Sequence, residues 1–506
     1  MTTKQKNIRD YIIGLVVIAI LICALIFCKE KNDLSLAEQS QDVELYQMVS
    51  MEGESITDMK VSDIAKVSYT LKDKETVVIE KVGEDWVING DKDFPFSQDS
   101  FKNQFLQRYI DGQMYATIDD YDNLSDYGMD EPSATLEVVD TKENKRTYLI
   151  GAYNSVISSY YIYHKEEDKL YAGTQDFLYI CRDDIYDFAE IDTFPSFSTT
   201  SLDYMIMNNG EKKVEFLYLP KGHESDPLGN STWFINSPFS YYRACESSVV
   251  IDNFDEVFTG VGFSQKVDYY ATDEELEAYG LKNSDKYYEI VYKFQDDEDK
   301  DQYEIVSVKV LFGNYDEEAD AYYARVILTQ GMEIDVERAR SINFISRTYA
   351  DKILNIDPVD YIYPFMLYVP MKDFAGGGMT VIDDDGTEYK FEYEAEYKTE
   401  TSTIPLTESM KFDGQDIDVD EFKEFYYKVV KIYVNRVIYE KDKIVDCEPT
   451  YVFKYDRVDD DYFGDAVMEF REYDATYYQV LINGVVDSLA VRRDVDSAVE
   501  VLKELK

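Results

Sequence analysis

Histidine is nearly absent from this chain of 506 residues, which contains only His164 and His223. Two histidines in distant parts of the sequence make a histidine-based general base or metal cluster a poor hypothesis. The chain also lacks a G-x-S-x-G motif, a Walker A loop, a CxxC motif and an HExxH motif. We therefore predict a protein that is not an enzyme, with no catalytic residue, cofactor-binding residue or metal ligand, and with no cofactor.

Cysteine is scarce as well, with five residues in the whole chain. Only Cys181, Cys245 and Cys447 lie beyond residue 28, which is too few for a disulfide framework. We predict three buried thiols rather than a redox site. The domain must then be stabilised by its apolar core, and a hydrophobic content of 45% allows for several cores.

Basic residues are outnumbered by acidic ones, with 51 Lys and Arg against 102 Asp and Glu, so the net charge is −51. This balance makes nucleic acid a poor candidate partner, because nucleic-acid binding needs a basic surface. Acidic runs at 296–299 and 459–461 are predicted to be solvated loops, with weak calcium binding as the alternative. Four residues match a calcium-loop template, but Val381 stands at its first position, so we predict a hairpin turn there: Asp383, Asp385, Gly386 and Glu392.

Long apolar runs are missing except for one, Tyr11–Cys28, which has 18 residues and no charge. As a helix it would be about 27 Å long, close to the thickness of a bilayer core. We predict a single-pass transmembrane helix at 11–28, with residues 1–10 as a cytoplasmic tail because Lys4, Lys6 and Arg9 precede the run. The large domain would then be extracytoplasmic, on the cell membrane. A cleaved signal peptide and a lipid-modified cysteine are the alternatives.

Each third of the remaining chain opens with two alternating runs around a turn, which is typical of a β-hairpin. The turns are Lys72-Asp73-Lys74, Asn208-Asn209-Gly210 and Asp383-Asp384-Asp385-Gly386. A short strand and a helix are predicted next, and each helix carries aromatic residues four positions apart: Phe101 and Phe105, Phe254 and Phe258, Phe422 and Tyr426. Ser97, Asp252 and Asp418 are the predicted N-caps of these helices.

Further landmarks recur in the first two thirds. Tyr127-Gly128-Met129 corresponds to Tyr279-Gly280-Leu281. A glycine that is followed nine residues later by a tyrosine pair also recurs, as Gly151 with Tyr160-Tyr161 and Gly313 with Tyr322-Tyr323. With 46 tyrosines in the chain, such pairs alone carry no weight, but the ordered set favours a repeat.

These patterns predict an α+β fold with an N-terminal transmembrane helix, followed by tandem repeats of an antiparallel hairpin–helix–strand unit. The predicted divisions are a linker at 29–59, repeat unit one at 60–195, repeat unit two at 196–355, and a linker with a diverged C-terminal unit at 356–506. The last two boundaries fall near Phe194-Pro195 and Asp357-Pro358, where proline interrupts the pattern.

The ordered pattern resembles a bacterial family of uncharacterised domains, domain-of-unknown-function family 4340. The residues that carry this resemblance are spread over most of the chain after residue 28: Trp86, Phe94-Pro95, Asp126–Pro132, Leu149-Ile150-Gly151, Tyr160-Tyr161 and the stretch from Phe422 to Leu505. The resemblance implies a membrane-anchored extracytoplasmic protein that is often encoded beside ABC-2 transporters and gliding-motility-type components. No catalytic residues come with it.

From the residues and the resemblance together we expect a non-enzymatic accessory protein of an ABC-type export or motility complex. It would act through protein contacts, with ABC transporter permease or auxiliary subunits as partners and no nucleic acid. The alternative is a cell-surface protein that binds a ligand, either a glycan or a cation.

Overall fold

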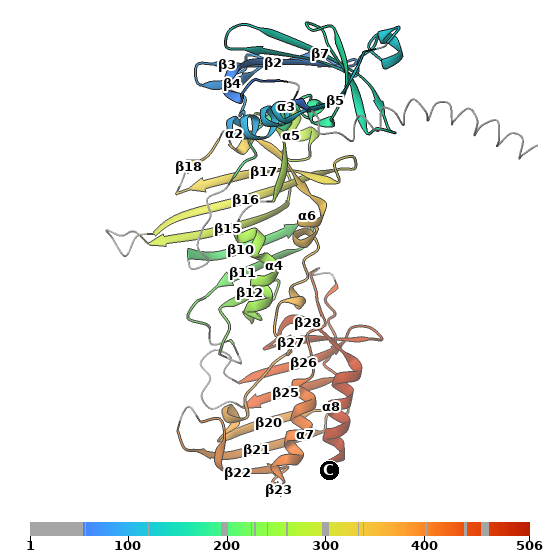
Figure 1. Cartoon of the computed structure of the whole chain (residues 1–506). Helices are drawn as coiled ribbons and strands as arrows, with labels where there is room; N and C mark the ends of the chain where they lie inside the picture. Colours follow the sequence, from blue (N-terminus) through green and yellow to red (C-terminus); the bar gives the residue numbers. More distant parts are fainter. Residues whose placement is uncertain are drawn as a thin grey trace, which may run out of the picture. The chain divides into compact units, whose positions relative to one another are not determined.

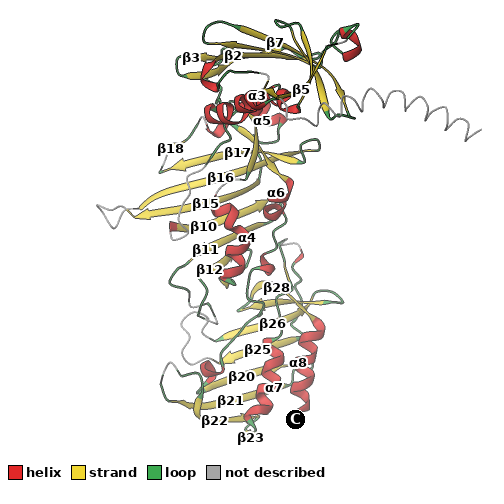
Figure 2. Ribbon diagram, viewed as in Figure 1, coloured by secondary structure: helices red, strands yellow, loops and turns green. Residues whose placement is uncertain are grey.

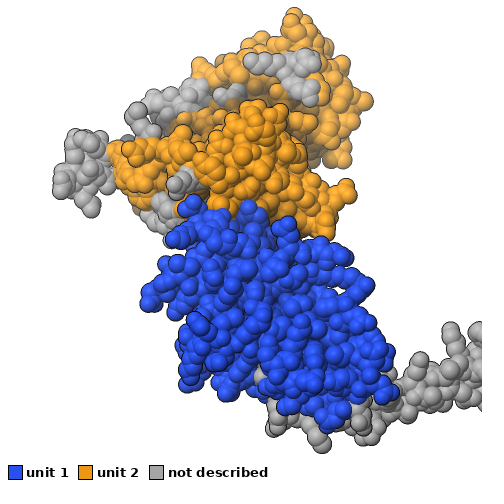
Figure 3. Space-filling view, turned by 90° about the horizontal axis from the view of Figure 1, so that it is seen from above, with its two compact units in different colours: residues 1–190 blue, residues 191–506 orange. Residues whose placement is uncertain are grey.

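The computed structural model describes residues 54–505 apart from residues 56, 120, 194–200, 224, 227–228, 240, 260–261, 296–302, 332, 337, 400–401, 440–442 and 457–464. The chain divides into two compact units, residues 1–190 and residues 191–506, which Figure 3 shows in different colours. The described part of unit 1 contains one β-sheet, and that of unit 2 contains two (Figures 1 and 2).

The first sheet has nine strands in the order β1-β5-β9-β8-β7-β6-β2-β3-β4. Alternation of apolar side chains explains its strands: in β2, Ile64, Val67 and Tyr69 are buried while the residues between them are only partly covered. The strands are β1 (Glu54–Ser55), β2 (Ile64–Leu71), β3 (Thr76–Val82), β4 (Asp85–Ile88), β5 (Gln113–Ile118), β6 (Ala134–Asp140), β7 (Lys145–Asn154), β8 (Ser159–His164) and β9 (Lys169–Gly173).

The second sheet has ten strands, ordered β13-β12-β11-β10-β15-β16-β17-β19-β14, with β18 paired to β17. The strands are β10 (Leu202–Asn209), β11 (Lys213–Tyr218), β12 (Trp233–Ser237), β13 (Arg243–Ala244), β14 (Phe263–Asp268), β15 (Lys286–Gln295), β16 (Tyr303–Asp316), β17 (Ala321–Gln330), β18 (Glu333–Ile334) and β19 (Ile342–Ser346).

The third sheet has nine strands, ordered β23-β22-β21-β20-β25-β26-β27-β28-β24. The strands are β20 (Gly377–Ile382), β21 (Glu388–Tyr397), β22 (Pro405–Phe412), β23 (Gln415–Ile417), β24 (Arg436–Val437), β25 (Tyr451–Asp456), β26 (Ala466–Glu472), β27 (Tyr477–Ile482) and β28 (Val485–Val491).

The three sheets share one strand order. In the first sheet, β2, β3 and β4 form a meander at one edge, the chain passes through a helix, and β5 joins the far side of the sheet. Strands β6 to β9 then fill the space between β2 and β5. The second sheet follows this plan with β14 as the strand after the helix, and the third sheet follows it with β24. What recurs is therefore a whole antiparallel sheet.

Helices pack on the faces of these sheets. In unit 1, Phe101 packs edge-to-face on Trp86 with ring centroids 5.0 Å apart. In unit 2, Phe254 of α4 contacts Phe216 of the second sheet, and Phe422 of α7 contacts Phe391 of the third. The helices are α2 (Gln98–Ser100) and α3 (Gln107–Asp111), joined by a π-helical turn, then α4 (Ser247–Thr259), α5 (Asp273–Ala278), α6 (Arg347–Leu354), α7 (Val419–Val430) and α8 (Arg492–Glu504).

The predicted fold class is wrong. The described chain is mostly antiparallel sheet, in three sheets of nine, ten and nine strands, and not a series of hairpin–helix–strand units. The predicted hairpins themselves exist, since β2 pairs with β3, β10 with β11 and β20 with β21. The error arose because a local pattern shows a hairpin but not the distant strand that pairs with it, as β6 pairs with β2.

The predicted localisation, a single-pass membrane protein, is also corrected. Among the residues that the structure describes, no helix is long and apolar enough to cross a membrane. The longest of them, α4 and α8, have 13 residues, whereas a bilayer needs about 20 apolar residues. The predicted span itself, Tyr11–Cys28, lies outside the described residues. The predicted repeat units at 60–195, 196–355 and 356–506 remain predictions, because the two compact units are a different division of the chain.

Candidate functional site

A pocket in unit 1 lies beside β4 and has a volume of about 500 Å³. This volume is within the range that small-molecule sites occupy, about 300–1,000 Å³. Its lining combines rings, carboxylates and one ammonium group: Val82, Asp85, Trp86, Val87, Asp91, Lys92, Phe94, Pro95, Phe96, Gln98 and Glu190. We call it the β4 pocket.

Short-range hydrogen bonds fix the wall of the β4 pocket. The Gln98 side chain accepts the Trp86 amide N–H and donates to the Trp86 carbonyl, both at 2.8 Å. The Gln98 amide thereby takes the place of a neighbouring strand at the edge of β4. On the opposite side the Glu190 amide donates to the Pro95 carbonyl at 2.7 Å, so the loop before α2 is held by the segment that follows the sheet.

The charges of the β4 pocket favour a cationic group. The lining contains three carboxylates, those of Asp85, Asp91 and Glu190, and one ammonium group, that of Lys92. The Asp91 carboxylate accepts amide N–H groups of its own loop, at 2.9 Å from Asp93 and 3.3 Å from Phe94. Asp91 therefore shapes the loop, while Asp85 and Glu190 are exposed.

Similar backbone hydrogen bonds hold the corresponding loop of the second sheet. The Glu246 amide donates to the Tyr361 carbonyl and the Tyr363 amide donates to the Ala244 carbonyl, both at 3.0 Å. The space beside these hydrogen bonds is small, about 40 Å³, and aromatic side chains and Arg243 contribute to its lining. The corresponding positions therefore leave an open pocket in unit 1 and a nearly filled one in unit 2.

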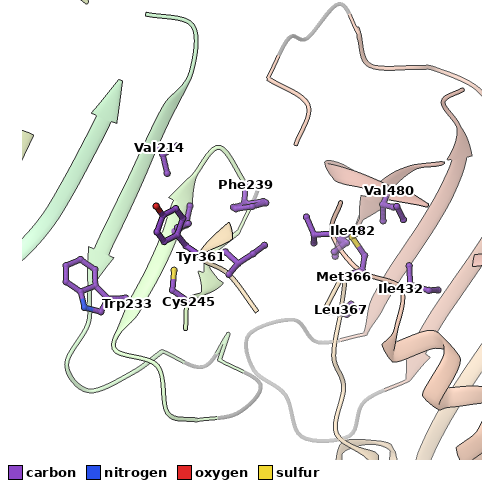
Figure 4. Packing of buried hydrophobic residues seen from close by; sticks show 14 of the residues in the cluster. Val214, Trp233, Phe239, Cys245, Tyr361, Met366, Leu367, Ile432, Val480 and Ile482 are labelled. Atoms are coloured by element: carbon purple, nitrogen blue, oxygen red, sulfur yellow. The ribbon is translucent and has the colours of Figure 1, made fainter. Parts of the chain in front are cut away.

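Arg243 joins the second sheet to the third within unit 2. Its guanidinium donates to the carbonyls of Phe365 and Met366, at 2.9 and 2.7 Å, and pairs with Asp487 of β28. The Arg243 and Asp487 side chains are 7% and 0% exposed. Figure 4 shows the apolar packing in this region, with Phe239 facing the side of the core that contains Ile482 and Val480. The buried pair acts as a structural link.

An apolar patch lies on the second sheet, on the face opposite α4 and α6. Tyr303, Ile305 and Ser307 lie two positions apart from one another on β16, so their side chains point to the same face. Ser307 pairs with Thr329 of β17, and Thr329 pairs with Ile334 of β18. The side chains of Tyr303, Ile305 and Ile334 therefore share one face. They are 56%, 44% and 54% exposed, and Val336, which follows, is 64% exposed. Helix α5 covers another part of this face, where Leu276 packs against Leu311. We call Tyr303, Ile305, Ile334 and Val336 the apolar patch.

The tyrosine–glycine step, the later glycine and the tyrosine pair that recur in the sequence pack together in each of the first two sheets. A Cβ on Gly151 would lie 2.1 Å from the Tyr127 carbonyl oxygen, and a Cβ on Gly313 would lie 2.2 Å from that of Tyr279. The second tyrosine of each pair packs on the same residue: Tyr161 on Tyr127 at 4.8 Å, and Tyr323 on Tyr279 at 4.6 Å. Since each landmark touches the next, the cluster is a packing motif.

The two histidines lie in different units. His164 is buried, and its Nδ1 accepts the Glu167 amide N–H at 3.2 Å. Burial lowers the pKa of His164. The His223 ring packs edge-to-face against Phe234 and Tyr242. Both rings thus contribute to local packing.

The cysteine prediction is only partly right. Cys245 is buried, but Cys181 is intermediate and Cys447 is exposed, and all three are free thiols. Cys447 lies among residues 444–450, which the structure describes as neither helix nor strand, and the sequence offers no periodicity there from which its burial could be judged.

The turn at 383–386 is the hairpin turn that the sequence predicts, between β20 and β21. The Asp383 carboxylate is buried and accepts hydrogen bonds from the Thr387 amide and the Tyr389 hydroxyl. The Lys503 ammonium lies 3.1 Å from this carboxylate and pairs with it. Within the described residues no cluster of three or more His, Cys, Asp or Glu side chains could hold a metal ion. The acidic runs 296–299 and 459–461 lie outside them.

Sequence reasoning missed the β4 pocket and the apolar patch. Glu190 is separated from Asp85 by about a hundred residues, and no spacing rule connects them. Ile334 and Ile305 lie on different strands of one face, so only the register brings them together.

Comparison with known proteins gives one match. The model of the family described as "Domain of unknown function (DUF4340)" matches residues 86–231. No curated protein and no solved structure matches the chain. The match begins at Trp86 and includes the first landmark cluster, but it covers less of the chain than the resemblance had suggested. The resemblance to the family described as a domain of unknown function, DUF4340, is therefore confirmed over residues 86–231.

Proposed function

We propose that this chain is a non-enzymatic accessory protein that acts through protein contacts. The observation that supports this proposal is the apolar patch, because an acidic protein with net charge −51 gains nothing in solubility from four exposed apolar side chains on one sheet. Grouped exposed apolar residues are typical of protein-binding surfaces. The family resemblance suggests ABC transporter permease or auxiliary subunits as the partners.

The test is affinity capture of the tagged chain from its native cells, followed by mass spectrometry. The wild-type chain should retain ABC permease or auxiliary subunits at high ionic strength, because apolar contacts resist salt. Ile305→Lys combined with Ile334→Lys should release them. Val156→Lys, which changes an exposed apolar residue of unit 1 outside the β4 pocket, serves as the matched control. Capture of no such subunit by the wild-type chain would refute the proposal.

The second candidate function is binding of a small ligand, and the β4 pocket supports it. Three carboxylates beside rings favour an organic cation over a neutral glycan. Isothermal titration with an organic diamine, with calcium and with a soluble oligosaccharide separates these classes. Binding of the diamine that disappears in Glu190→Gln, with Asp93→Asn as the control outside the pocket lining, would favour this second function.

A further inference from the structure

Arg325 of β17 lies on the face of the second sheet that carries the apolar patch. Strand β17 pairs with β16 in an unbroken register over residues 324–330. Thr329 and Arg325 are four positions apart on this stretch, so their side chains point to one face, about 13 Å from each other along the strand. Ile334 of the apolar patch pairs with Thr329. A protein that covers the apolar patch can therefore also reach Arg325.

The charge of Arg325 is not paired, in contrast to the other cations around it. Strand β16 and the short 3-10 helix at Arg338–Arg340 contribute three further cations, each with a carboxylate partner: Lys309 with Glu289 at 3.7 Å, Arg338 with Asp335 at 3.7 Å and Arg340 with Asp273 at 2.9 Å. Arg325 forms no ion pair with any residue that the structure describes. In a chain with 102 acidic and 51 basic residues, an unpaired and partly buried arginine is a local exception.

One edge of the Arg325 guanidinium lacks a hydrogen-bond acceptor. Its Nη1 donates to the Ala339 carbonyl at 3.2 Å. Its Nε is buried and has no acceptor among the described residues. Its Nη2 has no acceptor there either, but this atom is not buried, so it is open to solvent. Nε and Nη2 form the same edge of the planar group, and one carboxylate at this edge can accept from both.

The surroundings of Arg325 favour a negative group at this edge. Burial and the positive charge of Arg340 lower the pKa of Arg325, and the attraction of Asp273 only partly offsets them. Both effects disfavour the charged guanidinium, which nevertheless stays protonated at neutral pH. The net charge of −51 does not prevent the approach of a carboxylate, because physiological salt screens charges beyond about 8 Å. The contact is therefore decided by the local, unpaired cation.

We propose that Arg325 binds a carboxylate side chain of the partner protein that covers the apolar patch. This proposal rests on the proposed function and names the chemistry of the partner surface. The partner contributes apolar residues over the patch and an aspartate or glutamate about 13 Å away, at the vacant edge of the guanidinium. The apolar contacts provide affinity, and Arg325 provides selectivity, because a partner with a lysine at that place would meet an unpaired like charge.

The test uses the full chain and two labelled peptides, which alternate valine and serine and differ only in a terminal glutamate or glutamine. The wild-type chain should bind the glutamate peptide about ten-fold more tightly, because a hydrogen bond between charged groups contributes about 1.5–3 kcal/mol. Arg325→Gln should bind both peptides equally, and Arg325→Lys, which keeps the charge, should retain part of the preference. Arg338→Gln is the matched control, since Arg338 has its own carboxylate, and should keep the full preference.

Three results would overturn the proposal: equal binding of the two peptides by the wild-type chain, a glutamate preference that persists in Arg325→Gln, or binding of inorganic phosphate that depends on Arg325 while neither peptide binds. The last result would show a site for a free anion. Partner capture from native cells separates this proposal from the proposed function. If Arg325→Gln keeps the ABC subunits while Ile305→Lys with Ile334→Lys loses them, the accessory function stands and the contact at Arg325 fails.

Discussion

Two glycines show how single residues determine the packing of this chain. Gly151 and Gly313 each face a tyrosine carbonyl so closely that a methyl group cannot fit. Neither has a positive φ, so crowding alone requires glycine there. The sequence identified these glycines as landmarks, but it could not show that they touch Tyr127 and Tyr279.

Gly151→Ala should lower the free energy of unfolding of unit 1 by about 3 kcal/mol, because the new Cβ overlaps the Tyr127 carbonyl. Gly83→Ala is the matched control in the same unit. It has φ +71° and no atom within 4 Å, so it measures the cost of left-handed backbone by itself, about 1 kcal/mol. Chemical denaturation of both variants checks this, and equal losses would contradict the crowding argument.

The Arg243–Asp487 pair illustrates a buried charge whose removal is costly. Arg243→Met leaves the Asp487 carboxylate buried without its partner, so unit 2 should lose about 3–5 kcal/mol of stability. The double change Arg243→Met with Asp487→Leu should recover most of that loss, because no buried charge remains. Thermal and denaturant unfolding measure it. If the double variant is no more stable than the single one, the pair is not the cause.

Asp383 should make stability depend on pH in the acid range. Burial raises the pKa of Asp383, but hydrogen bonds with Asp385, Lys503 and Thr387 outweigh burial and lower the pKa to about 2. Because the folded pKa lies below the ordinary value of 3.8, the stabilisation is complete above about pH 4 and is lost as the pH falls toward 2.

The measurement is unfolding of wild type and Asp383→Asn between pH 2 and pH 7. The variant should be less stable at pH 7 by about 1–3 kcal/mol, and the difference should shrink below pH 4. Asp413→Asn is the matched control. Asp385→Asn is less suitable, because Asp385 contacts the same turn as Asp383. A difference that stays constant with pH would show that the carboxylate charge is not involved.

At the scale of single elements, a sequence signal predicted the structure correctly where the hydrogen bond behind it forms within the same element. Asp418 caps α7 as predicted, since its side chain accepts the Asp420 amide N–H. Asp252 was a wrong choice, because α4 begins five residues earlier at Ser247. The aromatic spacing located that helix, whereas several polar residues near its start competed as caps.

Strand β4 depends on a side chain for its outer edge, and Gln98 provides it. Gln98→Ala should leave the Trp86 amide and carbonyl without partners and destabilise unit 1 by about 1–3 kcal/mol. Gln107→Ala, in the neighbouring α3, loses only an exposed hydrogen bond to Asp111 and should have little effect. Hydrogen exchange at the Trp86 amide checks the local effect. Unchanged protection in Gln98→Ala would show that the edge is closed by something else.

At the scale of the whole molecule, the sheets could not be predicted from their sequence. Each hairpin is a local event with its own turn chemistry. The pairing of β2 with β6 joins residues about seventy positions apart, and that of β10 with β15 joins residues about eighty positions apart. Alternation shows that a segment is a strand without showing its neighbour. The apolar patch and the β4 pocket depend on those distant pairings, so they appear only in the folded chain.

We propose that the chain acts through protein contacts made by the apolar patch. Site-specific photocrosslinking in native cells tests it most directly, with benzoylphenylalanine in place of Ile305 and, as the control, in place of the exposed Val156. We expect a discrete adduct with an ABC permease or auxiliary subunit from position 305 and none from position 156. No adduct from either position, or the same adduct from both, would contradict it.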